Sequence, residues 1–360
     1  MPFSNSHLFF LYSQLFLTPA PLPRILSLAG KTGIITGSNT GLGYHASAQL
    51  LARGLSRLIL AVRDVKKGEA AKEMLLAGLD DGIMGRKGKA VVEVWELDLA
   101  RYESVVGFVE KVKTTRGLRV DFAVLNAAVA KFGFEVNETT RHEVTTQTNW
   151  LSTALLAVLL VPVLQAQYSS SERSTLTLPV MSIVGSETAQ WASLKEGKRA
   201  MRAGKSVIGA LDEKRNFDPA DRYYASKLLL LFFFMEFSER LDTPGMEGSS
   251  NDVVVNIVNP GFCYGSELHR EVKGVLGGIL ATVKRIIGRS TETGARTLAH
   301  AAVVDSVESH GKYLSDEKIR AFADYPSTPE GKAMQKQLWY EMAKELRGIV
   351  DVEKVMKGKK

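Results

Sequence analysis

The feature that most constrains the fold of this chain is a regular alternation of apolar strands and helical segments that begins near Lys31. Short connections separate these segments, and each apolar run has the length of a buried strand. The expected strands are Thr32–Thr36, Arg57–Val62, Val91–Leu97, Phe122–Leu125, Leu178–Val184 and Val253–Val258, and helices are expected over Tyr44–Arg53, Lys66–Leu79, Ser104–Thr114 and Arg141–Leu164. Repeated βαβ units predict an α/β fold with one doubly wound parallel sheet and helices on both faces.

Composition narrows the class further. With 360 residues, 45% of them hydrophobic, the chain can bury a large core. The single cysteine, Cys263, excludes an internal disulfide and suits a reducing, cytoplasmic location. The net charge of +7 comes from basic residues scattered among 39 acids, so we expect no nucleic-acid partner. The six histidines show no metal-ligand spacing, and no metal site is expected.

The N-terminus, residues 1–24, is predicted to be a separate apolar helical segment. Its core, Leu8–Leu17, is too short to span a bilayer as a helix, and no basic stretch precedes it as in a signal peptide. This helix therefore either packs on the domain or touches a membrane surface through residues 8–17. Residues 25–360 are expected to form the catalytic domain.

A glycine-rich turn joins the first strand to its helix. Its sequence is Thr36-Gly37-Ser38-Asn39-Thr40-Gly41-Leu42-Gly43. Glycines let the backbone approach a pyrophosphate closely, and the helix N-terminus stabilises its charge. In this strand–turn–helix context we predict a Rossmann-like dinucleotide site. The expected cofactor contacts here are Gly37, Asn39, Thr40, Gly41, Leu42 and Gly43.

The tip of the second strand favours NADP over NAD. Val62 and Arg63 stand where an NAD-binding unit places an acid for the ribose hydroxyl, and an arginine there accommodates a 2′-phosphate. Lys67, at the start of the next helix, could add charge. Asp64 leaves an alternative open, because it could pair with Arg63.

The candidate catalytic pair is Tyr223 and Lys227, in the sequence Tyr-Tyr-Ala-Ser-Lys. Residues four apart lie on the same face of a helix, so the ammonium is expected close to the phenol. A nearby positive charge should lower the tyrosine pKa from about 10 toward the range useful for acid–base catalysis.

These motifs together resemble the short-chain dehydrogenase/reductase family, and the resemblance covers roughly Leu28 to Tyr313. It implies that Asp98 contacts the adenine and that Asn126, in Asn126-Ala127-Ala128, borders the cofactor; Ala128 replaces the glycine usual there. It also implies that Asn149 is a catalytic asparagine holding a water that relays protons from Lys227.

The same resemblance assigns Pro260 and Gly261 to a turn beside the nicotinamide. The hydroxyl residue usual after that turn is displaced, because Gly265 stands in its place and Ser266 follows.

The catalytic serine is expected at the end of the fifth strand. Ser182 lies inside that strand, whereas Ser186 stands at its carboxyl end, where ligands meet an open parallel sheet. We therefore choose Ser186 to polarise the substrate oxygen, with Tyr223 as acid or base. By resemblance, Lys227 holds the nicotinamide ribose as well.

Two further segments are candidates for the substrate pocket. An insert at 187–222 is expected to cover the pocket, although a surface loop is an equal alternative for most of it. The apolar region 262–290 resembles a substrate lid, and an ordinary packed helix is the alternative. Its composition favours an apolar small molecule, such as a polyketide, terpenoid or retinoid-like compound, over a sugar.

We therefore predict an NADP-dependent oxidoreductase that interconverts a ketone or aldehyde and an alcohol. The alternative is a catalytically silent NADP(H)-binding module that acts as a redox-sensing partner protein. A homodimer is a further expectation, because the helix Leu228–Phe237 is apolar nearly all round and must be buried on its outer side. The N-terminal helix Leu8–Leu17 or a membrane surface could bury it instead. The outer faces expected to meet are Leu155, Leu159 and Val163 with Leu230, Phe233 and Phe237.

Overall fold

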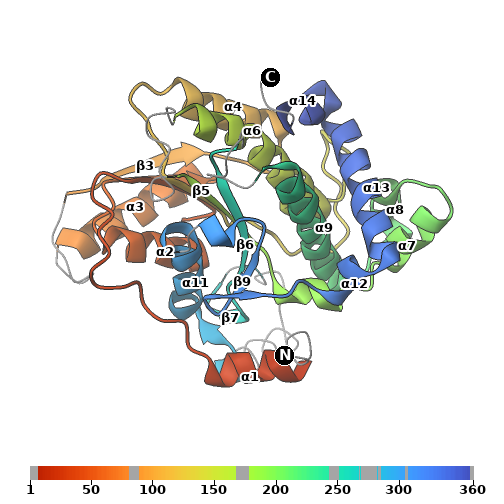
Figure 1. The fold of residues 1–360 in the computed structure, drawn as a ribbon, viewed down its shortest axis with the longest axis horizontal. Coiled ribbons are helices and arrows are strands. Elements are labelled where there is room, and N and C mark those ends of the chain that lie inside the picture. The colour runs from red at the N-terminus through yellow and green to blue at the C-terminus, as the bar shows by residue number, and fades with distance from the viewer. Residues whose placement is uncertain are drawn as a thin grey trace.

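The computed structural model describes residues 7–80, 89–167, 178–242, 251–266, 268, 282, 285–304 and 307–356. Within these residues the main sheet has eight strands in the order β10-β9-β6-β5-β4-β1-β2-β3 (Figure 1). The strands are β1 (Thr32–Thr36), β2 (Arg57–Val62), β3 (Val91–Glu96), β4 (Phe122–Leu125), β5 (Val180–Val184), β6 (Val254–Asn259), β9 (Tyr313–Ser315) and β10 (Lys318–Arg320). All neighbours pair in parallel except β9 and β10, which are antiparallel.

The parallel, doubly wound sheet predicted from the sequence is confirmed. Helices cover both faces, and neighbouring residues of β1 serve the two cores: Ile34 packs into one hydrophobic cluster and Ile35 into the other. One face carries α2 (Gly41–Leu51), α3 (Val65–Asp80) and α11 (Thr291–Val303), and the other α4 (Tyr102–Thr114), α6 (Ser152–Ala166), α9 (Pro219–Arg240), α13 (Pro329–Glu345) and α14 (Val352–Met356). The sequence analysis assigned no element after Val258 except the lid, so β9, β10, α11, α13 and α14 are additions.

The helix expected at Arg141–Leu164 begins later, at Val144. Glu143 caps it by accepting hydrogen bonds from the backbone N–H groups of Thr145 and Thr146, both at 2.9 Å. It continues through α5 (Val144–Thr146) and a π-helical turn (Gln147–Leu151) into α6. Residues 144–166 are long and apolar enough to cross a membrane by composition, but 78% of an apolar 18-residue window within them is buried inside the fold.

The outer face of α9 is covered by the chain's own C-terminus. The ring of Phe233 stacks on Trp339 of α13 with centroids 6.1 Å apart, and Leu230 and Phe237 are fully buried. On the neighbouring helix, α14 packs against α6. The apolar face from which a homodimer was predicted is therefore buried within one chain, and that reason for expecting a dimer is wrong.

The insert 187–222 forms a short 3₁₀ turn (Glu187–Trp191), α7 (Lys195–Arg202) and α8 (Val207–Leu211). Both helices pack against α13. Glu187, Thr188 and Trp191 of the insert line the cavity described below, and no residue of α7 or α8 does.

A buried histidine joins the insert to the C-terminal helix. His142 Nδ1 lies 2.7 Å from Asp212 Oδ2, and Nε2 lies 3.0 Å from Glu345 Oε1. Burial lowers the pKa of His142, but the hydrogen bonds to these two carboxylates and their charges outweigh burial and raise the pKa to about 9.

This contact predicts a pH-dependent stability. Because the folded-state pKa lies above the unfolded value, protonated His142 stabilises the fold fully below about pH 6.5, and the contribution is lost as the pH rises through about 9. A shift of this size is worth on the order of 3 kcal/mol. We expect the free energy of unfolding of the wild type to approach that of His142→Gln over this interval, measured by urea unfolding at several pH values. A difference that stays constant with pH would contradict the prediction.

Candidate active site

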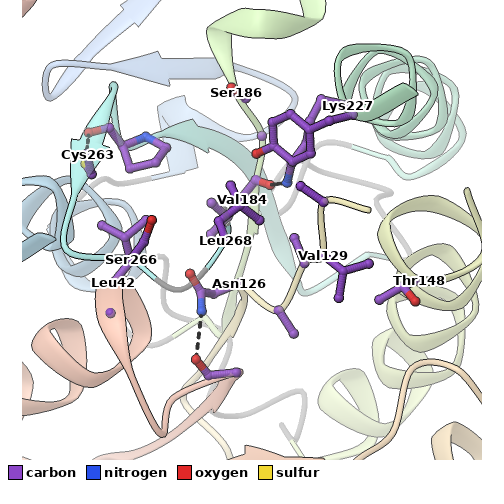
Figure 2. A pocket seen from close by; sticks show the side chains of 18 of the residues that line it. Leu42, Asn126, Val129, Thr148, Val184, Ser186, Lys227, Cys263, Ser266 and Leu268 are labelled. Carbon is purple, nitrogen blue, oxygen red and sulfur yellow. Dashed lines mark hydrogen bonds between the residues drawn. The ribbon is translucent and has the colours of Figure 1, made fainter. Parts of the chain in front are cut away.

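A cavity of about 890 Å³ opens at the carboxyl ends of the central strands. Such ends are where open α/β sheets bind ligands, at the point where strand order reverses. Here that point lies between β1 and β4, which pair directly. Figure 2 shows Ser186 and Lys227 grouped on one side of the cavity, with Leu42 and Asn126 toward the glycine-rich turn.

The glycine-rich turn is shaped to hold a phosphate group. Gly37 and Gly41 adopt φ angles of 63° and 58°, which favour glycine. A Cβ on Gly43 would lie only 2.6 Å from the carbonyl oxygen of Gly37, so the turn requires glycine there. Thr40 is the N-cap of α2, but its side chain makes no capping hydrogen bond, which leaves the first N–H groups of the helix for an anion. The residues present therefore fit a dinucleotide pyrophosphate. Gly37, Asn39, Thr40, Gly41 and Leu42 line the cavity.

The tip of β2 presents basic side chains to the same cavity. Arg63 and Lys67 line it, and both are exposed. Asp64, which the sequence could not assign, accepts a hydrogen bond from the backbone N–H of Lys67 at 3.1 Å. Within the described ranges Arg63 forms no ion pair, so its guanidinium is available to a ligand.

Asn126 holds the first turn in place and also borders the cavity. Its amide donates to the carbonyl oxygens of Thr36 and Gly37 at 2.8 and 3.2 Å. The close approach to Gly37 occurs at Ala127, to which a Cβ on Gly37 would come within 2.9 Å. Ala128, which replaces the glycine usual in the family, therefore lies one residue beyond this tight contact. Asp98 also lines the cavity, and its carboxylate accepts from the backbone N–H of Ala100 at 3.0 Å.

Tyr223, Ser186 and Lys227 meet in the cavity wall. Tyr223 and Lys227 lie one turn apart on α9, and Lys227 Nζ is 5.9 Å from the Tyr223 ring centroid. Lys227 donates a hydrogen bond to the carbonyl oxygen of Val184 at 2.8 Å. The hydroxyl groups of Ser186 and Tyr223 are hydrogen-bonded.

The electrostatics of this group differ from the prediction. Burial raises the pKa of Tyr223 well above its ordinary value, and the hydrogen bond to Ser186 opposes this only in part. Burial also lowers the pKa of Lys227 to about 8. The predicted lowering of the Tyr223 pKa by Lys227 is therefore wrong for this arrangement, because burial and the neighbouring Tyr224 raise that pKa and Lys227 is not among the groups that shift it. The phenol is kept protonated, the form needed to donate a proton.

The other candidate serine is excluded by its surroundings. Ser182 is fully buried inside β5 and does not line the cavity, whereas Ser186 does. Ser186 also caps the 3₁₀ turn that follows, and its hydroxyl accepts from Thr188 Oγ1 at 2.9 Å. The serine is thus fixed at the end of the strand.

Asn149 lies behind the wall, in the π-helical turn. Its side chain exchanges hydrogen bonds with the backbone N–H and C=O of Val129, both at 2.8 Å, and donates to Ser226 at 3.0 Å. Its neighbour Thr148 lines the cavity, and Asn149 does not. The side chain therefore ties the Val129 loop to α9, next to Tyr223 and Lys227.

The turn after β6 borders the cavity beside the end of β5, where Asn259 also accepts a hydrogen bond from the backbone N–H of Glu187 at 3.3 Å. Pro260 and Gly261 line the cavity, and Gly261 donates its backbone N–H to Asn259 at 3.1 Å. Gly265 adopts a φ of 83°, which explains a glycine where the family usually has a hydroxyl residue. Ser266 lines the cavity instead, facing Gly41.

Sequence reasoning missed an aromatic wall at the mouth of the cavity. The wall consists of Phe10, Trp191, Tyr224 and Phe262, which come from four separate segments. Phe10 and Trp191 meet edge to face with centroids 5.1 Å apart, and Phe10 contacts Phe262 at 6.1 Å. No local motif marks them, because only the fold brings them together. Of the predicted lid 262–290, Leu268 and Ile287 line the cavity, while residues 267, 269–281 and 283–284 lie outside the described residues.

An acid that the sequence analysis did not identify follows the serine. Glu187 lines the cavity, and burial, reinforced by the charge of Asp316, raises its pKa to about 8 despite the opposing effect of Arg289. Near neutral pH its side chain is therefore mostly protonated and could donate a hydrogen bond.

Taken together, the site can bind a dinucleotide along its glycine-rich edge and protonate an oxygen at Tyr223. The described residues contain no cluster of His, Cys, Asp or Glu able to hold a metal ion. The side chains of Ser186, Tyr223 and Lys227 offer proton transfer and hydrogen bonding in this cavity.

Comparison with known proteins supports the same family. Residues 31–192 match the family model for short chain dehydrogenases. The short-chain dehydrogenase fogG of Aspergillus ruber is 37% identical over 94% of this chain and 93% of its own length. The short chain dehydrogenase/reductase mfmJ of Annulohypoxylon moriforme is 35% identical over 95% of this chain and 93% of its own length.

Solved structures share the fold at lower identity. An uncharacterised protein from Mycobacterium paratuberculosis superposes with a TM-score of 0.60, at 22% identity over 93% of this chain and 97% of that one. L-sorbose reductase from Gluconobacter frateurii, complexed with NADPH and L-sorbose, superposes with a TM-score of 0.55. It is 19% identical, over 81% of this chain and 96% of that one. Together with relatives matched over nearly their whole length, the site geometry identifies this chain as an oxidoreductase of the short-chain dehydrogenase/reductase family.

Proposed function

We propose that this protein is an NADP(H)-dependent oxidoreductase that interconverts a ketone or aldehyde and the corresponding alcohol. The observation that carries the proposal is the hydroxyl of Tyr223, hydrogen-bonded to Ser186 and one helical turn from Lys227, in the wall of a cavity with a dinucleotide cradle. A catalytically silent binding module would have no need for this arrangement.

The residues divide the work in carbonyl reduction as follows. A bound nicotinamide supplies or accepts the hydride. Ser186 and Tyr223 hydrogen-bond the carbonyl oxygen, and Tyr223 transfers its proton there as negative charge develops. The ammonium of Lys227 stabilises the resulting phenolate. In oxidation the same groups run in reverse, with Tyr223 as the base.

Arg63 and Lys67 support the choice of NADP over NAD. Each lines the cavity at the tip of β2, and Asp64 is engaged in capping α3. Two solved structures that share the fold involve this cofactor. L-sorbose reductase is described in complex with NADPH, and the 3-quinuclidinone reductase of Rhodotorula rubra is described as NADPH-dependent.

Arg63→Ala is expected to weaken NADPH binding roughly tenfold to hundredfold, because a charged hydrogen bond is worth about 1.5–3 kcal/mol. NADH affinity should stay nearly unchanged, since it lacks the 2′-phosphate. Fluorescence titration with both cofactors measures this, and Lys66→Ala, an exposed lysine outside the cavity lining, is the matched control. Equal dissociation constants for NADPH and NADH in the wild type would contradict the assignment.

The aromatic wall supports an apolar substrate, such as a polyketide, terpenoid or retinoid-like compound. Phe10, Trp191 and Phe262 offer ring faces and edges that favour flat or hydrocarbon surfaces over a sugar. A panel of apolar ketones and aldehydes, followed by NADPH absorbance, tests the proposal. If no member of a broad panel were reduced at the expense of NADPH, the catalytically silent binding module would be favoured.

A further inference from the structure

The N-terminal helix α1 (His7–Phe16) has its polar and apolar faces inverted with respect to the protein. Ser13 and Gln14 are buried against the domain. The apolar residues Leu8, Leu11, Tyr12, Leu15 and Phe16 are exposed by 70%, 40%, 51%, 54% and 71%. Positions 8, 11, 12, 15 and 16 follow helical spacing, so they form one continuous stripe, which we call the α1 stripe. In water this arrangement exposes apolar area that no described residue covers.

The inner face of α1 is anchored to the domain. Arg289 donates to the carbonyl oxygens of Ser13 and Leu17 at 3.0 and 3.3 Å, and it is itself held by a buried ion pair with Asp316 at 2.9 Å. Gln14 accepts the backbone N–H of Phe262 at 3.1 Å. The stripe therefore faces outward because the polar face has specific partners on the domain.

The helix also forms part of the cavity mouth. Phe10, on its inner side, lines the cavity beside Trp191 and Phe262. Figure 1 shows α1 along the lower edge of the molecule, at the opposite end from α14. One side of α1 thus lines the cavity, and the α1 stripe lies on its exposed side.

One arginine contacts α1, and exposed basic and apolar side chains follow it in the sequence or precede Arg289, which holds it. The helix contains no Asp, Glu, Lys or Arg. Arg320 lies over the ring of Phe9, with its guanidinium carbon 5.1 Å from the centroid. Beyond the helix, Ile25 is exposed by 95% next to exposed Arg24, and Ile286 by 70% next to exposed Arg285. The pair at 285–286 lies only a few residues before Arg289, which holds α1.

From this combination we propose that the α1 stripe docks on the surface of a lipid bilayer containing acidic headgroups, with the cavity mouth at the membrane. A helix of 10 residues without Asp, Glu, Lys or Arg is too short to span a bilayer, but an apolar face with Arg320 packed on the same helix suits one that lies in the interface. A protein partner is the less suitable occupant, because the stripe offers it no charge or hydrogen-bonding group besides the Tyr12 hydroxyl. Docking is independent of the proposed function; its consequence, that an apolar substrate enters from the bilayer, rests on the proposed function.

The test is co-sedimentation of the full chain with vesicles of phosphatidylcholine containing about 30% phosphatidylserine. The wild type should sediment with the vesicles, and Leu8→Ser/Leu15→Ser should partition at least about tenfold less, since each leucine loses most of its burial in lipid. Met74→Ser/Tyr340→Ser is the matched control, because these helical side chains are exposed by 56% and 61% far from α1 in sequence. The control should sediment like the wild type. NADPH binding and melting temperature, unchanged in all three, show that the fold is intact and separate this test from that of catalysis.

Three results would overturn the proposal. The wild type could remain in the supernatant, or the stripe variant could sediment as well as the control. Light scattering without lipid could instead show a dimer that the stripe variant dissociates, which would assign the stripe to a second copy of the chain.

Discussion

Replacement of Tyr223 by phenylalanine is expected to lower the turnover of carbonyl reduction by a factor of about 10²–10⁴, the usual contribution of a positioned general acid. In the proposed function the phenol donates its proton to the substrate oxygen, and burial keeps the phenol protonated. The substitution removes one oxygen atom and leaves the ring, so the packing of α9 should persist. Single-turnover NADPH oxidation measures the chemical step, and cofactor titration measures binding, which should change less than about threefold.

The adjacent tyrosine supplies the matched control. Tyr224 also lines the cavity, with its ring centroid 6.3 Å from that of Tyr223, but it belongs to the aromatic wall at the mouth. Tyr224→Phe should retain most of the turnover, and its effect should fall mainly on KM. If the two variants lost turnover equally, Tyr223 would not be the general acid, and another group would have to protonate the substrate oxygen.

The parts of this site that sequence could predict are those in which residues near one another in the chain do the work. The turn Gly37–Gly43 and the pair Tyr223–Lys227 are local patterns, with spacing that follows from turn and helix geometry. Ser186 was assigned from its position at a strand end, which the parallel sheet places at the cavity.

Features that depend on distant segments could not be predicted in this way. Phe10 reaches the cavity only because Arg289, 276 residues from Ser13, holds α1 in place. The predicted dimer face is buried by α13, which carries no motif that would indicate its partner. The pKa of Tyr223 depends on how completely the folded chain excludes water, and helical spacing gives no measure of that.

Arg222 is expected to contribute more to stability than any surface charge of the insert. It precedes Tyr223 and is only 3% exposed, and its guanidinium donates to Glu143 Oε2 at 3.2 Å and to the carbonyl oxygen of Leu211 at 2.6 Å. Glu143 is fully buried. Arg222→Met should lower the free energy of unfolding by about 3–5 kcal/mol, because it leaves the carboxylate of Glu143 buried without its cation. Urea unfolding followed by circular dichroism measures this.

Two further variants distinguish charge burial from a general effect of the substitution. Arg215→Met removes an arginine of the same insert that is 81% exposed and paired with Glu213, and it should leave the free energy of unfolding nearly unchanged. In Arg222→Met/Glu143→Gln the uncompensated charge is gone, while the amide oxygen can still accept from the N–H groups of Thr145 or Thr146. The double variant should therefore be more stable than Arg222→Met alone. A double variant with the summed losses of both single changes would show that the contacts of Arg222 to backbone carbonyls, rather than the buried charge, account for its effect.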